Sequence, residues 1–167
     1  MDMKVTVNKN RKEKPVWDDC GFCKYYSDHM FVMEYDDSKG WFNAQIKKYG
    51  QFLIDPSALV FHYGQAVFEG MKAFYGVDGK IRLFRPEMNL ERMNKTQERL
   101  AMPEFDSEFV LDAIKKLVNI DKDWVPPVEG MAMYIRPFSI ATGTTLGVKR
   151  SDKYKMFVIL SPVGAYY

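Results

Sequence analysis

A first pair of short apolar runs lies near the start of the chain. Met30–Tyr35 alternates loosely between apolar and polar residues and is rich in residues that favour strands. Lys39-Gly40 then provides a turn before a similar run at Trp41–Ile46. This pattern predicts a β-hairpin.

The clearest local signal in the chain predicts a second hairpin. Met71–Tyr75 and Lys80–Phe84 are aromatic or β-branched runs that flank Gly76–Gly79, whose Asp78-Gly79 step favours a tight turn. Met131–Phe138 and Lys155–Leu160 are further apolar runs of strand length. Short strands are therefore expected to supply most of a sheet.

Two amphipathic helices are predicted between these strands. Arg85-Pro86 opens the first, because proline is favoured at a first helical position, and Met102-Pro103 ends it. Its apolar face carries Leu90, Met93 and Leu100. The second begins at Asp106 or Ser107, either of which can cap a helix. Its core positions at helical spacing are Phe109, Val110, Ala113, Ile114, Leu117 and Val118.

Strand pairs followed by helices, without strict βαβ alternation, predict an α+β domain. We expect a two-layer sandwich in which a mainly antiparallel sheet carries helices on one face. The 167 residues are enough to close one core. The basic segment Met1–Lys14 lacks an apolar run, so we expect residues 1–19 to form a flexible arm rather than a signal peptide. Residues 20–167 are expected to form the domain.

Charge and composition narrow the classes of function. The 24 basic and 22 acidic residues are interspersed, so no stripe indicates nucleic acid or an anionic membrane as a partner. No run approaches the ~18 apolar residues of a membrane span, and a cytoplasmic protein is expected. The aromatic share of 15% favours an aromatic-walled pocket besides the core. Motifs of serine hydrolases, phosphate loops and dinucleotide sites are absent from the sequence.

The two cysteines form a Cys20-Gly-Phe-Cys23 pair. Such a spacing can serve as a redox dithiol when it opens a helix after a strand, or as half of a zinc site. Charged, aromatic-rich sequence surrounds the pair and no second pair exists, so two reduced thiols are expected. Since His29 and His62 are the two histidines of the chain, no metal site is expected.

Three segments place aromatic rings beside an arginine or a glycine. We predict that His62–Lys72 is a strand end passing into a short helix and out through a glycine, and a well-packed elbow is the alternative to a site. Arg92 lies next to the apolar face of the first helix and either points inward at an anion or is a solvated surface charge. Tyr134 and Arg136 face the same side of a strand, where they could hold a carboxylate.

At these positions the sequence resembles the class IV, fold-type IV pyridoxal phosphate enzymes, and most closely the branched-chain amino acid aminotransferases. The resemblance covers roughly residues 20–167, and its ordered motifs are together much more specific than any one of them. They are Ser27-Asp-His-Met30, His62-Tyr63, Phe68-Glu-Gly70-Met-Lys-Ala-Phe74, Arg82-Leu-Phe-Arg-Pro86, Asn89-Leu-Glu-Arg-Met93, Tyr134-Ile-Arg-Pro137, Leu146-Gly-Val-Lys149 and Leu160-Ser-Pro-Val-Gly164. The implied fold is the amino-terminal domain of the D-amino acid aminotransferase-like fold.

The resemblance implies roles for the matching residues. Arg92 would bind the phosphate of pyridoxal 5'-phosphate, and Arg136 would receive the distal carboxylate of glutamate or 2-oxoglutarate. An apolar pocket would accept leucine, isoleucine and valine. The loop with Leu146 and Val148 would reach the neighbouring subunit's site in a homodimer. The pocket-lining residues that the resemblance implies are Phe22, Tyr63, Phe68, Gly70 and Tyr134.

In this family the Schiff-base lysine lies on a carboxy-terminal domain, beyond an interdomain linker at which the present chain is expected to stop. Lys149 and Lys155 lie in other motifs, so no catalytic residue is assigned and the chain alone is expected to be inactive. Alternatives are a D-amino acid aminotransferase, an aminodeoxychorismate lyase, or a non-catalytic dimerisation or regulatory module of the same fold. The segments Tyr134–Pro137 and Leu146–Lys149 favour the branched-chain family.

Overall fold

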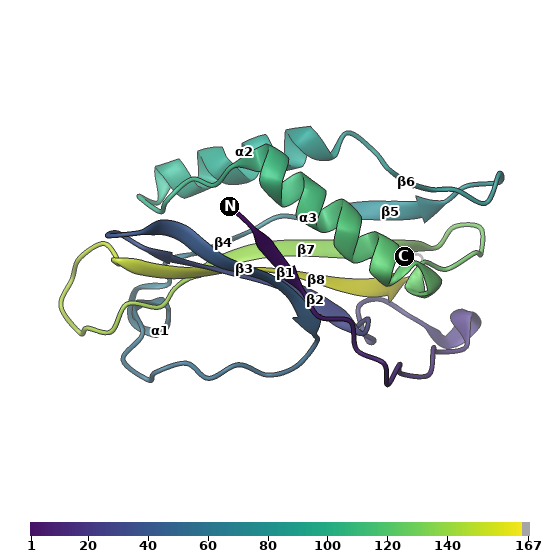
Figure 1. The fold of residues 1–167 in the computed structure, drawn as a ribbon, viewed down its shortest axis with the longest axis horizontal. Coiled ribbons are helices and arrows are strands. Elements are labelled where there is room, and N and C mark those ends of the chain that lie inside the picture. The colour runs from purple at the N-terminus through teal and green to yellow at the C-terminus, as the bar shows by residue number, and fades with distance from the viewer. Residues whose placement is uncertain (165–167) are drawn as a thin grey trace.

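In the computed structural model, which describes residues 1–164, an eight-stranded sheet carries two long helices on one of its faces (Figure 1). The domain end expected at Tyr167 lies outside the described residues. In chain order the elements are β1 (Met3–Val5), η1 (Trp17–Asp19), β2 (His29–Asp36), β3 (Gly40–Lys48), α1 (Leu59–Tyr63), β4 (Ala66–Phe68), β5 (Met71–Tyr75), β6 (Ile81–Leu83), α2 (Pro86–Arg99), α3 (Ser107–Ile120), η2 (Lys122–Trp124), β7 (Ala132–Ala141) and β8 (Lys153–Val163).

The sheet is antiparallel except at one edge. Its strand order is β1-β3-β2-β8-β7-β5-β6, and β4 also pairs with β7. Strand β1 runs parallel to β3, and the other pairs among residues 1–164 are antiparallel. The predicted α+β sandwich, with a mainly antiparallel sheet and helices on one face, is confirmed.

Both predicted hairpins are confirmed. Strands β2 and β3 pair from His29↔Lys48 to Asp36↔Gly40, with a register shift between Val32 and Glu34. In the second hairpin, the Gly76 amide donates to the Lys80 carbonyl at 2.8 Å. Gly79 has a φ of +75°, a conformation that residues with a Cβ rarely adopt, so the turn favours glycine at this position.

Helix α2 begins at Pro86 as predicted but ends at Arg99, before the predicted stop. Leu90 and Met93 are buried, whereas Leu100 is 42% exposed, so its assignment to the apolar face was wrong. The reason is that Leu100 lies past the last helical turn. Seven residues after Leu90 the buried position is held by a glutamine, Gln97, whose amide donates to the Pro103 carbonyl.

Helix α3 has the capped start and apolar stripe that the sequence predicts. The Asp106 carboxylate accepts hydrogen bonds from the amides of Glu108 at 3.0 Å and Phe109 at 3.1 Å. Its buried residues are Val110, Leu111, Ala113, Ile114, Leu117 and Val118. These side chains pack with Leu90 and Met93 of α2 on the strands below, where they form one continuous core. Among the described residues, no helix combines the length and the apolar character needed to cross a bilayer.

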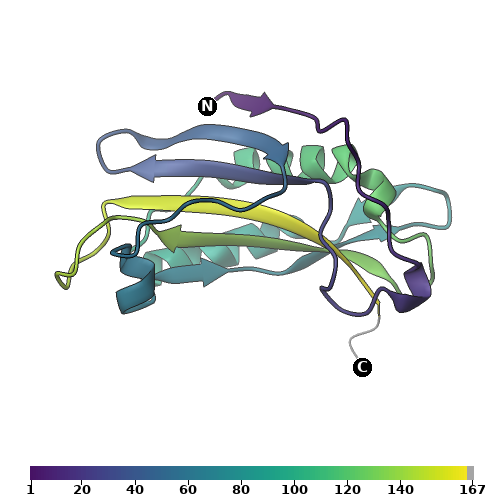
Figure 2. The same ribbon diagram turned by 90° about the horizontal axis from the view of Figure 1, so that it is seen from below.

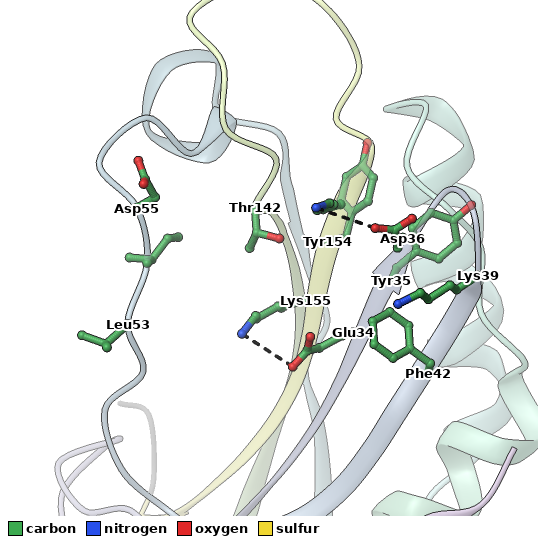
Figure 3. A pocket seen from close by; sticks show the side chains of 12 residues that line it. Glu34, Tyr35, Asp36, Lys39, Phe42, Leu53, Asp55, Thr142, Tyr154 and Lys155 are labelled. Carbon is green, nitrogen blue, oxygen red and sulfur yellow. Dashed lines mark ion pairs between the residues drawn. The ribbon is translucent and has the colours of Figure 1, made fainter.

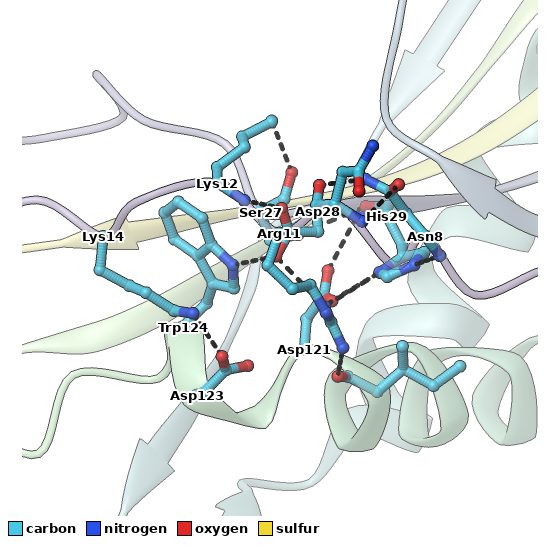
Figure 4. Close-up of polar contacts among 12 residues, drawn as sticks. Asn8, Arg11, Lys12, Lys14, Ser27, Asp28, His29, Asp121, Asp123 and Trp124 are labelled. Carbon is cyan, nitrogen blue, oxygen red and sulfur yellow. Dashed lines mark hydrogen bonds and ion pairs between the residues drawn. The ribbon is translucent and has the colours of Figure 1, made fainter.

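The segment before β2, which includes the arm predicted over residues 1–19, makes polar contacts with the domain. Asp28, His29 and Asp121 are fully buried, and Arg11 pairs with Asp121 at 2.6 Å and with Asp28 at 3.2 Å (Figure 4). The Lys12 amide donates to Asp28 at 2.8 Å. No local pattern predicts this attachment, because the acids that fix the arm lie as far as 110 residues away.

The ring of His29 is held from both sides in this arm cluster, which we define as Asn8, Arg11, Lys12, Asp28, His29 and Asp121. The Asn8 amide donates to Nε2 of His29 at 2.7 Å, so Nε2 is the acceptor nitrogen of the ring. The ring proton therefore belongs on Nδ1, which lies 2.6 Å from the Asp121 carboxylate. Buried polar groups of this cluster are thus paired with one another rather than turned toward a ligand.

The face of the sheet opposite the helices is much less covered. A coil after β3 crosses it on the way to α1 (Figure 2), and Phe52 of this coil packs on Phe157 with ring centroids 4.7 Å apart. Alternate residues of β7 face this side, because their neighbours Met133 and Ile135 belong to the core under the helices. The β7 residues on the open face are Tyr134, Arg136, Phe138 and Ile140.

Candidate functional site

Two adjoining hollows on the open face share Arg136 and Ile159. The first, of about 320 Å³, is lined by Ala66, Val67, Phe68, Arg136, Phe138, Ile140 and Ile159. The second, of about 250 Å³, is lined by Phe22, Cys23, Tyr26, Tyr134, Arg136, Ile159 and Ser161. Three residues that the sequence predicts for one site, Phe22, Phe68 and Tyr134, therefore lie around a fourth, Arg136.

Arg136 is held between aromatic rings. Its guanidinium carbon lies 4.5 Å from the centroid of the Phe68 ring and 5.2 Å from that of Tyr134. Its Nη2 donates to the Tyr134 hydroxyl at 2.8 Å. Its Nε is buried and has no hydrogen-bond partner within residues 1–164. A buried donor without a partner costs about 1–3 kcal/mol, and a carboxylate in the hollow would remove that cost.

Gly70 makes the position of Tyr134 possible. A Cβ placed on Gly70 would lie 2.2 Å from the Tyr134 hydroxyl, which is far inside any real contact distance. Gly70 lies directly before β5 and is separated from β4 by Glu69, and both strands pair with β7. The predicted order of His62–Lys72 was wrong. The segment begins in helix α1, which ends at Tyr63 and is capped by Gly64 with a φ of +64°, and strands β4 and β5 follow.

Arg92 points from α2 to a buried carboxylate. Its Nε and Nη2 both donate to Glu69, the latter at 2.9 Å, while the Arg92 side chain as a whole is 67% exposed. Burial opposes the charged form of Glu69, but hydrogen bonds from Arg92, Asn89 and the Gly70 amide outweigh it and lower the pKa of Glu69. Within residues 1–164 no partner of Arg92 Nη1 is found, so that edge of the guanidinium is available to an anion.

Glu69 and Asn89 are the site residues that sequence reasoning did not select. Both stand inside motifs that the sequence offers, Phe68-Glu-Gly70 and Asn89-Leu-Glu-Arg92. The signal that could have found them is an acidic residue within an otherwise apolar segment, because such a group is buried only with a partner.

Tyr63, Leu146 and Val148 form a second group at the α1 end of the sheet. The Tyr63 hydroxyl donates to the Leu146 carbonyl, which ties the loop after β7 to α1. The amide of Leu59 donates to the Gly143 carbonyl at 3.0 Å and strengthens this attachment. The side chains of Leu146 and Val148 remain 68% and 87% exposed. Neither they nor Tyr63 line the two hollows around Arg136.

Cys20 and Cys23 are both free thiols. The Cys20 thiol is buried and donates to the Pro162 carbonyl at 3.3 Å, and burial raises the pKa of Cys20. Cys23 lines the hollow beside Tyr134. Within the described part of the chain, no group of three or more His, Cys, Asp and Glu side chains is placed to hold a metal ion.

A further hollow of about 350 Å³ lies between β2, β8 and the coil that crosses the sheet (Figure 3). Its charged side chains are loosely paired, Lys155 with Glu34 at 3.7 Å and Lys153 with Asp36 at 3.8 Å. None of the residues predicted for the site lines it. The hollow around Arg136 is therefore the candidate site.

The chain is similar to known branched-chain aminotransferases. The chain is 51% identical over 93% of its length to branched-chain-amino-acid transaminase 1 of Bacillus subtilis and covers 44% of that protein. It is 48% identical over its full length to a probable branched-chain-amino-acid aminotransferase of Staphylococcus epidermidis, of which it covers 47%. The chain thus spans less than half the length of these relatives. No family model matches the chain.

Solved structures share the fold at low sequence identity. The branched-chain amino acid aminotransferase from Thermobaculum terrenum in its PLP-form matches with a TM-score of 0.58 and 20% identity, over 83% of this chain and 40% of that one. The Escherichia coli branched-chain amino acid aminotransferase matches with a TM-score of 0.60 and 17% identity, over 82% and 40%.

The curled, mostly antiparallel sheet with helices on one face has the fold of the amino-terminal domain of fold-type IV aminotransferases. Within that class, the chain belongs to the branched-chain aminotransferase family as a part of such a protein. The family is one of enzymes.

Proposed function

We propose that this chain is the substrate-side part of a branched-chain amino acid transaminase. The complete enzyme would transfer an amino group between leucine, isoleucine or valine and 2-oxoglutarate by a ping-pong mechanism with pyridoxal 5'-phosphate. The observation that carries the proposal is Arg136, which stands between Phe68 and Tyr134 with a buried, unpartnered Nε in an otherwise apolar hollow. Residues 20–167 would form this domain, and a cofactor domain would follow it.

The hollow is chemically suited to both kinds of substrate. Arg136 would receive the distal carboxylate of glutamate or 2-oxoglutarate through Nε and Nη2, and the Tyr134 hydroxyl would add a hydrogen bond. With an aliphatic substrate, the rings of Phe22 and Phe68 would contact the branched side chain, and Gly70 would contribute by leaving room for Tyr134. Tyr63 would close the pocket from the α1 side.

The residues present fit the phosphate of the cofactor. Arg92 is 67% exposed, and among the described residues its guanidinium is bound only through Nε and Nη2, both of them to Glu69. Arg92 would hold the phosphate, and the bound cofactor would supply the electron sink that makes the α-proton of the amino acid acidic. The lysine that moves this proton would come from the cofactor domain.

The loop with Leu146 and Val148 would complete the site of a neighbouring subunit in a homodimer. Its support is the exposure of both apolar side chains on a loop that Tyr63 fixes in place. An exposed apolar pair on a fixed loop is suited to insertion into a partner. The enzyme would act in the cytoplasm, in branched-chain amino acid biosynthesis.

The role of Arg136 is testable in the complete enzyme that contains this chain. Arg136→Ala should raise the KM for 2-oxoglutarate about 100-fold, because a charged bidentate contact is lost, and should raise that for leucine much less. Arg82→Ala is the matched control, since Arg82 is exposed on β6 and pairs with Asp78. Equal losses for both substrates would exclude the carboxylate role.

A further inference from the structure

The buried carboxylate of Glu69 connects two parts of the site that the proposed function treats separately. Glu69 is 6% exposed and accepts four hydrogen bonds. Two come from Arg92, one from the Asn89 amide group at 3.0 Å and one from the Gly70 backbone amide at 3.0 Å. A carboxylate bound on all sides in this way is fixed in position, because each lost contact would leave a buried charge unpaired.

On one side, Glu69 sets the direction of Arg92. The side chain of Arg92 is 67% exposed and would otherwise sample many rotamers. With Nε and Nη2 bound to one carboxylate, the planar guanidinium is held in a single orientation.

On the other side, Glu69 and Asn89 set the backbone at Gly70. Asn89 donates to both the Glu69 carboxylate at 3.0 Å and the Gly70 carbonyl at 3.2 Å, so helix α2 holds this bend from above. The bend brings Gly70 so close to Tyr134 that a Cβ would meet the hydroxyl at 2.2 Å. Tyr134 in turn accepts the hydrogen bond from Arg136.

We propose that Glu69 is a positioning residue that sets the geometry of Arg92 and, through Gly70 and Tyr134, of Arg136. The anchor for a phosphate and the anchor for a substrate carboxylate are then placed by one side chain. This inference rests on the proposed function for the roles of the two arginines. Asn89 supports it by tying α2 to the same bend.

The proposal is tested on the 167-residue chain by NMR, first without any ligand. Glu69→Gln should abolish the slowly exchanging Arg92 Nε–H signal and shift the signals of the Gly70 amide and Arg136 Nε–H. Glu91→Gln, which removes an exposed carboxylate from the same helix, should leave all three unchanged. Asn89→Ala should keep the Arg92 signal and shift the other two. Unchanged Gly70 and Arg136 signals in folded Glu69→Gln, or in Asn89→Ala if Glu69→Gln does not fold, would overturn the coupling.

A second measurement, the affinity of the chain for glutarate, distinguishes an effect of the position of the Glu69 side chain from an effect of its charge. Glu69→Gln and Glu69→Asp should both bind glutarate about tenfold more weakly than the unsubstituted chain. Each change alters the fixed position of the Glu69 side chain and so weakens the bidentate contact between Arg136 and glutarate. If Glu69 acted by its charge alone, Glu69→Gln would bind glutarate more tightly and Glu69→Asp would be unchanged, which would refute positioning. An unsubstituted chain that does not bind glutarate would count against the role of Arg136, while the ligand-free signals would still decide that of Glu69.

Discussion

Gly70 shows at the scale of one residue how closely the site is packed. Gly70→Ala would place a methyl group 2.2 Å from the Tyr134 hydroxyl, and 2.9 Å from its ring carbon Cζ. Tyr134 must therefore move, so we expect a loss of about 1–3 kcal/mol in the free energy of unfolding. Urea denaturation measures this loss.

The matched control for this substitution is Gly50→Ala, because a Cβ at Gly50 meets nothing within 4 Å. Adding Tyr134→Phe to Gly70→Ala removes the closest atom and should restore part of the stability, so the two changes would be non-additive. Additive losses would show that Gly70 and Tyr134 do not compete for the same space.

Residues of the candidate site could be predicted from the sequence where a motif contains the residue type that a particular ligand group requires. Tyr134 and Arg136 face one side because alternate strand residues do, and the structure places both at the hollow. The burial of Glu69 could be inferred from its apolar neighbours, but its hydrogen-bond partners could not, because its four donors come from a bend and a helix whose relative placement depends on the folded chain. Leu100 was misplaced for a similar reason: an apolar residue at a helix end is buried only if the helix continues.

At the scale of elements, the arm before β2 contributes a pH-dependent part of the stability. Burial opposes the charge on Asp28, but hydrogen bonds from the Lys12 amide, the Trp124 indole and Arg11 outweigh it and lower the pKa of Asp28. This stabilisation is present above the pKa of about 3.9 of an unfolded aspartate, and it is lost as the pH falls through the lower folded value.

Asp28→Asn should therefore reduce the free energy of unfolding by about 3 kcal/mol at pH 7 and make its fall between pH 5 and pH 3 shallower than in the unsubstituted chain. Urea denaturation across this pH range gives both quantities. Asp112→Asn, at an exposed position of α3, is the control. Parallel pH profiles for Asp28→Asn and the unsubstituted chain would contradict the assignment.

Elements were predictable where the pattern is local. The hairpins at β2–β3 and β5–β6 follow from strand patterns with a turn between them, and α3 from its cap and stripe. Strand β1 was missed because three residues are too few to show the alternation of apolar and polar positions that marks a strand. It becomes a strand by pairing in parallel with β3, about 40 residues later in the chain, as the pair Met3↔Ala44 shows. The contacts of the arm are of the same long-range kind.

At the scale of the whole molecule, the proposed function makes the open face one wall of a site. We expect the 167-residue chain alone to show neither an imine absorbance with pyridoxal 5'-phosphate nor transamination of leucine. Lys155 is engaged with Glu34, and Lys149 belongs to an exposed loop. Absorbance spectroscopy after borohydride reduction tests for a lysine adduct.

The variant Lys72→Ala is the control for this experiment. Lys72 lies in register with Tyr134 across β5 and β7 and is therefore an amine on the open face. An adduct that disappears in Lys72→Ala would mean that the chain carries its own lysine for the cofactor, and the proposed division between two domains would be wrong. An adduct spread over many lysines would be nonspecific surface chemistry and would leave the division intact.

The attachment of the arm also has a consequence for how the protein is made. Arg11 and its partner Asp121 are 110 residues apart, and Asp28 is 96 residues from the Trp124 that donates to it. At about 5–20 residues per second, roughly 5–20 seconds of translation separate Arg11 from Asp121. During that interval the arm can already join Asp28 but lacks Asp121, so its attachment is completed only after the segment that carries Asp121 and Trp124 has been synthesised.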